Sequence, residues 1–152
     1  MSSKITSLEN YVSHSSHNTV LVGGCFDILH IGHIRFLNNA RAQGDYLIVV
    51  LEPDEFIKTK KGRTPFHTQK ERAEVLAALS MVDKIVLIPR LYVSNDYKDL
   101  VLKIRPNIIA VSEGDPSMAN KSAFSALVNG SIKIVTSHIH HKSTSDILKD
   151  QY

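Results

Sequence analysis

The sequence predicts a single α/β domain built on a doubly wound, parallel sheet of five strands, the Rossmann-like arrangement. Short runs rich in Val, Ile and Leu recur along the chain, and segments with helical spacing separate them. The chain has 152 residues and is 43% hydrophobic, which is enough for one sizeable core. Strands that alternate with helices imply right-handed βαβ units and therefore a parallel sheet.

The strands are expected where apolar residues follow one another almost without interruption. Such runs are typical of strands buried on both faces of a parallel sheet, whereas half-exposed strands alternate. The five runs are "TVLV" (19–22), "YLIVVL" (46–51), "KIVLI" (84–88), "NIIAV" (107–111) and "IKIV" (132–135).

The first helix is expected after the first strand, over residues 33–43. Ile34, Leu37 and Ala40 have helical spacing there, and Gly44 stands where a glycine commonly ends a helix.

A second helix is predicted over residues 67–80, which are rich in strong helix formers. Thr68 followed three residues later by Glu71 is a capping box. Further helices are expected over 95–105 and 117–129, and the basic stretch "KTKKGRTP" that follows the second strand is expected to be a loop.

The N-terminal segment is expected to form a helix or tail outside the main domain. Ile5, Leu8 and Val12 have the spacing of a short amphipathic helix. The predicted organisation is therefore an N-terminal helix or tail at 1–17 and one domain at 18–152.

Composition narrows the classes of function. The net charge of +3 and the pI of about 9.0 fit an anionic ligand, but no clustered basic face or interleaved aromatic residues indicate nucleic acid. One cysteine excludes an intramolecular disulfide, and the absence of a signal-like segment or a long apolar run predicts a cytoplasmic protein without a membrane span.

The stretch "GGCFDILHIGH" after the first strand is the main candidate site. Ligands of open parallel sheets bind beyond the carboxyl ends of the strands, and Gly23 and Gly24 allow a ligand to approach the backbone there. His30 and His33 share one helix face near a helix N-terminus, with Gly32 between them. Two imidazoles and free N–H groups form a cradle for phosphate oxygens.

These residues resemble the "GxFDxxHxGH" signature of the nucleotidyltransferase superfamily, which includes the cytidylyltransferases. The resemblance extends almost end to end and is strongest to the bacterial heptose 1-phosphate adenylyltransferases, or ADP-heptose synthases. "KITSLENYV", "NNARAQGDYLIVV", "ERAEVLAALSMVDKIV" and "IRPNIIAVSEGD" are similar to successive segments of these enzymes, and "KSTSDI" stands where they carry "STTxII". The resemblance implies the fold of that superfamily and transfer of a nucleotidyl group to a phosphorylated acceptor with release of pyrophosphate.

The resemblance also implies catalytic roles for four residues. His30 and His33 would hold the triphosphate and stabilise the charge of the transition state. The family uses a lysine from the loop after the second strand, for which Lys61 is the first choice and Lys58 the second. Arg72 matches a helix arginine directed at the β- or γ-phosphate.

Other residues are assigned to nucleotide or acceptor binding by the same resemblance. Asp27 would bind the acceptor or help to position magnesium, with capping of the following helix as the alternative. A last helix is expected to begin near Ser143, where its hydroxyls and N–H groups suit a terminal phosphate. The nucleotide-binding set is Gly23, Gly24, Cys25, Phe26, Gly32, Lys58, Gly114, Asp115, Ser143, Thr144 and Ser145.

Two further features bear on this assignment. "SEGDP" replaces the "KGGDY" of the nearest relatives, so that Glu113 and Pro116 alter a loop that would contact the base or ribose. His138, His140 and His141 are not interpreted as a zinc site, which would need further ligands at set spacing. His140, His141 and Lys142 are instead expected to contact the triphosphate, because they adjoin the expected last helix. No metal site is predicted in the protein, and Mg²⁺ is expected together with the nucleotide.

The expected substrates are ATP and a sugar 1-phosphate such as heptose 1-phosphate. Ser80 replaces an arginine of the related cytidylyltransferases, which disfavours CTP. The alternatives are a CTP-dependent enzyme of the glycerol 3-phosphate type, an FMN adenylyltransferase, and a nucleotide-binding protein without turnover. A separate sugar kinase and a homodimer formed through the opening helix and "PRLYVSNDY" (89–97) are also expected.

Overall fold

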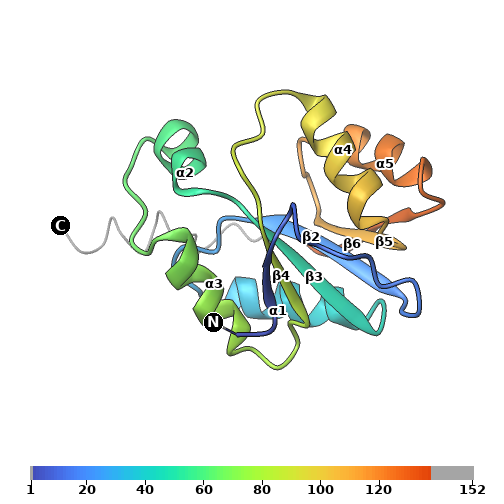
Figure 1. Cartoon of the computed structure of the whole chain (residues 1–152), viewed down its shortest axis with the longest axis horizontal. Coiled ribbons are helices and arrows are strands. Elements are labelled where there is room, and N and C mark those ends of the chain that lie inside the picture. The colour runs from blue at the N-terminus through green and yellow to red at the C-terminus, as the bar shows by residue number, and fades with distance from the viewer. Residues whose placement is uncertain (1, 138–152) are drawn as a thin grey trace.

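The computed structural model describes residues 2–137 and shows a six-stranded, fully parallel sheet with the strand order β1-β4-β3-β2-β5-β6 (Figure 1). The chain runs outwards from β2 to β3 and β4, and then crosses back to place β5 on the other side of β2. The crevice between β2 and β5 is therefore the topological switch point, where open α/β sheets bind ligands. The strands are β1 (Ile5–Ser7), β2 (Thr19–Gly24), β3 (Tyr46–Leu51), β4 (Lys84–Leu87), β5 (Ile108–Ser112) and β6 (Ser131–Thr136).

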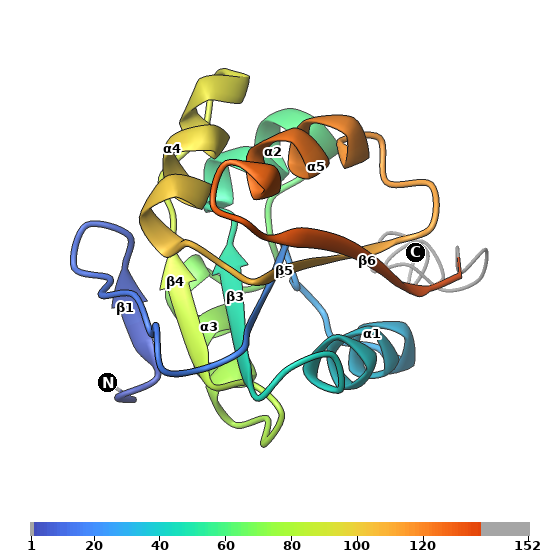
Figure 2. The same cartoon turned by 90° about the vertical axis from the view of Figure 1, so that its right-hand side faces the viewer.

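Helices cover both faces of the sheet. Leu37 of α1 and Leu76 of α3 pack against one face, and Leu100 of α4 packs against the other. The opposite placement of α1 and of the α4–α5 pair is visible in Figure 2. The helices are α1 (Ile31–Arg41), α2 (Asp54–Lys61), α3 (Gln69–Ala77), α4 (Ser94–Ile104) and α5 (Met118–Ala126).

The central strands are buried on both faces, as their near-continuous apolar composition predicts. Val20, Leu21 and Val22 of β2 are completely buried, because helices cover both sides of the sheet there. The edge strand β6 differs, since Ile134 is 56% exposed and none of its residues is fully buried. The expected α/β class is confirmed, with six strands instead of five.

The sixth strand corrects the prediction of an N-terminal helix. Residues 5–7 form β1, which pairs in parallel with β4 so that Ile5 lies opposite Ile85. Backbone hydrogen bonds extend the pairing, since the N–H of Ile85 donates to Lys4 and that of Leu8 to the last residue of β4. Val12 is 74% exposed, so the three apolar side chains do not share one buried helix face. Pairing with a free sheet edge outweighed the weak helical spacing.

The stretch expected to be a basic loop is helical over its first half. The helix α2 runs from Asp54 to Lys61, with two acidic residues in its first turn and three lysines in its last. That charge distribution complements the helix dipole. Ile57 is completely buried and fixes α2 on the domain.

The end of α1 also differs from the prediction. The helix ends at Arg41, its C-cap is Ala42 with ordinary helical angles, and Gly44 comes two residues later. Gly44 is required for close approach, because a Cβ there would lie 2.3 Å from the carbonyl oxygen of Asn18.

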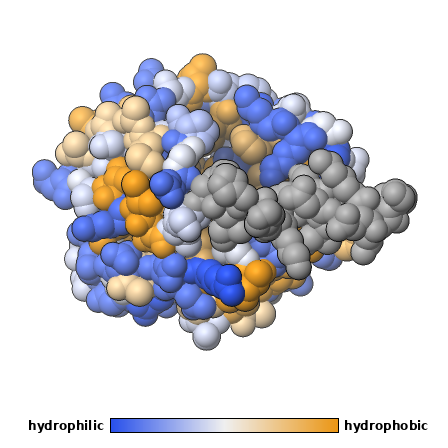
Figure 3. All heavy atoms as spheres, turned by 180° about the vertical axis from the view of Figure 1, so that it is seen from behind, coloured by the Kyte–Doolittle hydropathy of each residue, from blue (hydrophilic) through white to orange (hydrophobic). Residues whose placement is uncertain are grey.

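No helix within residues 2–137 is both long enough and apolar enough to span a bilayer. On the face opposite to that of Figure 1, apolar patches alternate with hydrophilic side chains (Figure 3).

Candidate functional site

The N-terminus of α1 is capped by two histidines. His30 is the N-cap residue, and its Nδ1 accepts a hydrogen bond of 3.1 Å from the backbone N–H of Gly32. The ring of His33 reaches back, with its Nδ1 3.4 Å from the backbone nitrogen of His30. The two imidazoles are stacked with centroids 3.8 Å apart. They take the places that serine and glutamate have in an ordinary capping box.

Both imidazoles are held in the neutral form at neutral pH. Burial lowers the pKa of His30. Burial, the imidazole of His30 and the charge of Lys61 lower the pKa of His33 to about 4, although a hydrogen bond with the backbone of Ile28 opposes the shift. Because the Nδ1 of His30 accepts a hydrogen bond, its proton is on Nε2, which is free to donate to an anion.

The loop between β2 and α1 is shaped around Phe26. This residue has a φ of 46°, which is unusual for a side chain of its size, and its ring lies 5.2 Å from that of His33. Gly24 is needed beside it, because a Cβ at that position would lie 2.9 Å from the Phe26 ring.

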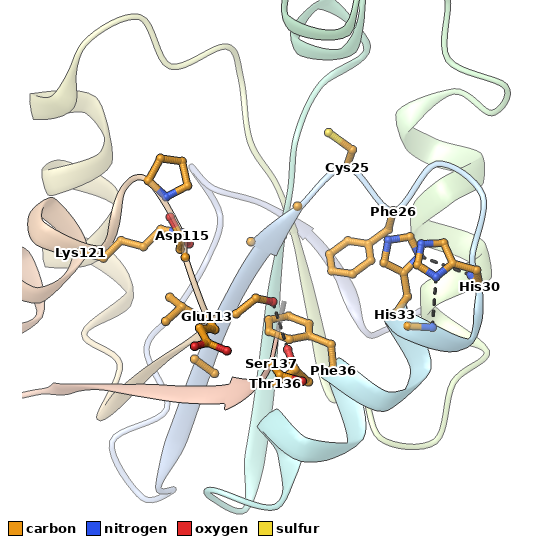
Figure 4. Close-up of a pocket in the computed structure, with 18 residues that line it drawn as sticks. Cys25, Phe26, His30, His33, Phe36, Glu113, Asp115, Lys121, Thr136 and Ser137 are labelled. Atoms are coloured by element: carbon orange, nitrogen blue, oxygen red, sulfur yellow. Dashed lines mark hydrogen bonds and ion pairs between the residues drawn. The ribbon is translucent and has the colours of Figure 1, made fainter. Parts of the chain in front are cut away.

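A cavity of about 450 Å³ opens in front of this loop, at the switch point between β2 and β5. Figure 4 shows Phe26 and the two histidines on one side of it and the loop that carries Glu113 and Asp115 on the other. The structure thus brings together these predicted residues of the first cavity: Gly23, Gly24, Cys25, Phe26, His30, Gly32, His33, Gly114 and Asp115.

Lys121 is a cavity residue that the sequence did not reveal. Its ammonium group lies 2.6 Å from the carboxylate of Asp115, six residues earlier. Asp115 also accepts a hydrogen bond from the backbone N–H of Ser117, which fixes the loop before α5. No motif marks Lys121, because its position depends on how α5 packs beside β5.

Asp27 lies in a different environment from the one expected. Its side chain is 1% exposed and accepts hydrogen bonds from the Arg63 guanidinium and from the backbone N–H groups of Phe66 and His67. Burial alone would raise the pKa of Asp27, but these hydrogen bonds outweigh it and lower the pKa. The carboxylate therefore ties the β2–α1 loop to the segment before α3. It neither caps α1, which His30 does, nor lines the first cavity.

Arg72 was expected to face the triphosphate but is completely buried. It donates to the carbonyl oxygens of Cys25, Glu52 and His67, and it forms an ion pair of 2.7 Å with Asp54. Arg72 thus connects the chain segments that follow β2 and β3, at the carboxyl ends of these strands. Glu71 and Asp83, the carboxylates that a surface arginine at this position could pair with, are engaged elsewhere: Glu71 with Thr68 and Asp83 with Arg41.

The lysines of α2 have three different positions. The charge of Lys61 acts on both Cys25 and His33, so this side chain is near the histidine pair. Lys60 lines a second cavity, whereas Lys58 and Lys61 are both exposed and line neither of the two, so the charge effect alone distinguishes Lys61 from Lys58. The structure thus favours Lys61 over Lys58 as the residue near the phosphates.

The second cavity, of about 490 Å³, lies on the other side of the loop after β2. It shares Gly23, Gly24, Cys25 and Lys121 with the first cavity, and we call these four residues the shared wall. Burial raises the pKa of the Cys25 thiol, which does not favour a thiolate nucleophile there. The remaining lining mixes polar and apolar side chains and includes the aromatic residues Phe56, Tyr92, Tyr97 and Phe124.

The segment 89–97, expected at a dimer interface, contributes to this second cavity through Leu91, Tyr92, Val93 and Tyr97. Tyr92 and Val93 are 74% and 61% exposed. A homodimer stays a prediction, and light scattering would test it by returning about twice the chain mass of 16.9 kDa.

Several predicted positions lie outside the described residues. These are the last helix, its phosphate-binding candidates Ser143, Thr144 and Ser145, the histidines at 138, 140 and 141, and Lys142. Within residues 2–137, no group of three or more His, Cys, Asp or Glu side chains is placed to hold a metal ion.

Comparison with known proteins identifies the relatives of the chain. The family model described as cytidylyltransferase-like matches residues 21–146. An FAD synthase of Pyrococcus abyssi is 46% identical over 92 residues, which are 60% of each chain. The bifunctional protein HldE of Campylobacter fetus is 34% identical over 148 residues, which cover 95% of this chain but 31% of that protein. The chain thus matches less than two thirds of the length of these relatives.

Solved structures support the same fold. A lipopolysaccharide core biosynthesis protein from Thermoplasma volcanium superposes with a TM-score of 0.64 at 25% identity, over 83% of this chain and 99% of that one. A pantoate-beta-alanine ligase from Francisella tularensis superposes with a TM-score of 0.62 at 16% identity, over 95% of this chain and 72% of that one, which supports the fold alone.

Proposed function

Because the chain belongs to the cytidylyltransferase-like family, we propose that it transfers an adenylyl group from ATP to a phosphorylated small molecule. The observation that carries this proposal is the pair of cavities separated only by the shared wall at the end of β2. The first would hold the nucleotide against the histidine pair, and the second the acceptor. The two substrates would then meet at Gly24 and Cys25.

The reaction needs positioning and charge neutralisation but no covalent intermediate. An oxygen of the acceptor phosphate attacks the α-phosphorus of ATP and forms a new P–O bond, while the bond from the α-phosphorus to the bridging oxygen breaks and pyrophosphate leaves. The Nε2–H of His30, the imidazole of His33 and the ammonium of Lys61 would face the oxygens that gain charge. Arg72 supports this arrangement by fixing the carbonyl of Cys25.

Residues 2–137 do not supply a cage of side chains for Mg²⁺. The buried Asp27 carboxylate is occupied by three donors, and Asp115 is paired with Lys121. Magnesium commonly keeps most of its water and is held by substrate phosphates with few protein ligands. The described residues therefore fit an ion that arrives with the triphosphate and lowers its charge.

The choice of ATP over CTP is supported by the relatives and not by Ser80. Ser80 is exposed and lies between α3 and the start of β4, at the opposite end of the sheet from the ligand edge. Ser80 is thus too far from the first cavity of its own chain to contact the nucleotide base. The matched relatives are named FAD synthase and HldE, and both names refer to adenylyl transfer.

The proposed acceptor is a sugar 1-phosphate such as heptose 1-phosphate. The match to HldE, which joins a heptose kinase to an adenylyltransferase, extends over 95% of this chain. A separate phosphorylating enzyme would have to supply such an acceptor.

FMN is the second candidate acceptor, and one observation favours it. Aromatic side chains of α2, α4, α5 and the segment between β4 and α4 line the second cavity, and such walls suit a flat ring system. The matches to FAD synthases are also higher in identity, although they span 60% of the chain.

Pyrophosphate release tests the proposal. ATP or CTP would be combined with heptose 1-phosphate, FMN or glycerol 3-phosphate in the presence of Mg²⁺, and each nucleotide would also be incubated without an acceptor. Release that requires ATP and one of the first two acceptors is expected. Release with CTP and glycerol 3-phosphate would identify a cytidylyltransferase, and tight ATP binding without release from any pair would leave a nucleotide-binding protein.

A further inference from the structure

The second cavity contains a buried carboxylate oxygen that has no partner. Glu52 follows β3, and its backbone is fixed because its N–H donates to Gly24 and its carbonyl accepts from Arg72. Its side chain lines the second cavity, and within residues 2–137 no group forms a hydrogen bond with its Oε2, which is shielded from solvent. An oxygen of this kind is costly unless a donor reaches it.

The neighbouring cations are hydrogen-bonded to other groups. The guanidinium of Arg72 donates to three carbonyl oxygens and to Asp54, and Lys121 donates to Asp115. Arg90 donates through Nη1 to the hydroxyl of Thr59, whereas its buried Nε, like Oε2 of Glu52, forms no hydrogen bond within residues 2–137. Burial raises the pKa of the carboxyl at position 52, although the charges of these three cations oppose the rise.

The location of this carboxylate indicates which part of an acceptor it would meet. The acceptor phosphate must reach the shared wall, where Lys121 contributes a positive charge. Glu52 follows the neighbouring strand β3, and its side chain lines the second cavity but not the first. It would therefore contact the body of the acceptor and not its phosphate.

The charge around the carboxylate selects the kind of donor. Lys60 and Lys121 line the same cavity, and two arginines act on the carboxylate from its edge, so a cationic ligand is disfavoured. A metal ion is equally disfavoured, because the described residues offer no group of three metal-binding side chains. Neutral hydroxyl groups can donate to a carboxylate without adding positive charge.

We propose that Glu52 is a specificity-determining residue that accepts hydrogen bonds from hydroxyl groups of the acceptor, which is therefore a polyhydroxylated phosphate monoester. This inference rests on the proposed function and deepens it by naming the feature of the acceptor that the protein reads. A site built to bind a substrate hydroxyl discriminates strongly against analogues that lack it.

Direct binding tests the role of this residue without turnover. Wild type, Glu52→Gln and the control Glu74→Gln would be titrated calorimetrically with heptose 1-phosphate, with FMN, and with cyclohexyl phosphate, a monoester without hydroxyl groups. ATP would be titrated into each variant as a check on the first cavity. Glu74 is exposed on α3 and lines neither cavity, so it controls for the loss of one negative charge.

Wild type and Glu74→Gln should bind at least one of the polyhydroxylated phosphates about tenfold or more tightly than cyclohexyl phosphate, since hydrogen bonds to charged groups are strong. Glu52→Gln should reduce this preference to within about threefold and leave the affinity for ATP unchanged. An undiminished preference in Glu52→Gln, or no binding of any monoester to wild type, would overturn the inference. Failure of the proposed function would look different: wild type would bind these phosphates but release no pyrophosphate with ATP.

Discussion

The two cavities that meet at the end of β2 are built in different ways. Two short segments form most of the first cavity, the β2–α1 loop and the loop after β5, and backbone groups, glycines and a helix N-terminus dominate it. The second is assembled from side chains of α2, α4, α5 and the segment after β4, and many of these are aromatic. A triphosphate can be held by local backbone geometry, which a short motif encodes, whereas the shape of an acceptor has to be matched by side chains from distant segments.

The largest effect is expected from a substitution of Arg72, whose side chain donates to the carbonyl of Cys25 in the shared wall. Its loss should disturb the structure of both cavities. Arg72→Met removes the partner of Asp54 and leaves the carbonyls of Cys25, Glu52 and His67 without their donor. Breaking a buried pair of this kind costs about 3–5 kcal/mol of the free energy of unfolding. Urea denaturation would measure the loss.

The matched control is Arg41→Met, which removes a partly exposed ion pair with Asp83. It should cost about 1 kcal/mol or less. If Arg72→Met kept the stability of wild type while losing activity, Arg72 would act on the substrate, as the sequence suggested, and not on the fold.

A change in the first cavity alone should affect the rate. His33→Ala removes an imidazole that lines the first cavity, where the triphosphate is proposed to bind, and loss of one such group typically lowers kcat by about 10²–10³-fold. His17→Ala, at the opposite end of the sheet, should keep the rate of wild type. Steady-state pyrophosphate release would measure kcat, and a residual rate within about threefold of wild type would exclude the role of His33.

A change in the second cavity alone should affect the acceptor. Tyr92 is 74% exposed, so its truncation leaves the core intact, but it contributes part of the aromatic wall. Tyr92→Ala should raise KM for the acceptor by roughly threefold to tenfold, as expected for one lost aromatic contact. KM for ATP should stay unchanged, and an equal rise in both constants would show that the two cavities do not work separately.

The first cavity should also make the stability of the protein depend on pH. His33 has a pKa of about 4 in the folded chain and an ordinary value of 6.5, so the unfolded chain binds more protons between these values. The free energy of unfolding should therefore fall as the pH is lowered from about 6.5 to about 4. Thermal denaturation of wild type and His33→Asn across this range would measure the contribution, and identical profiles would show that His33 does not make it.

The contrast between the cavities also explains what the sequence could predict. The apolar runs located the central strands, because a strand covered on both faces leaves no room for polar alternation. The glycines and histidines after β2 located the first cavity, because they lie close together in the sequence where β2 ends and α1 begins. Thr68 and Glu71 form the capping box that the sequence indicated at the start of α3.

The remaining features depend on packing between distant segments. Arg72 lies on the buried face of α3 and therefore supports the fold. The residues next to Arg72 in the sequence do not reveal which face of the helix is buried. The pairing of β1 with β4 depends on a sheet edge that is distant in the sequence, since Ile5 pairs with Ile85, 80 residues later. Lys121 and Glu52 have no motif around them, and they become functional candidates only when α5 and β3 are placed beside β2.

Initial-rate kinetics with both substrates varied test the central claim most directly, namely that donor and acceptor occupy the two cavities at the same time. ATP and the acceptor identified by pyrophosphate release would be varied independently over a range that brackets each KM. We expect sequential kinetics, with intersecting double-reciprocal lines and no pyrophosphate release without the acceptor. Parallel lines, together with a burst of pyrophosphate from ATP alone, would indicate a nucleotidyl-enzyme intermediate and contradict the account.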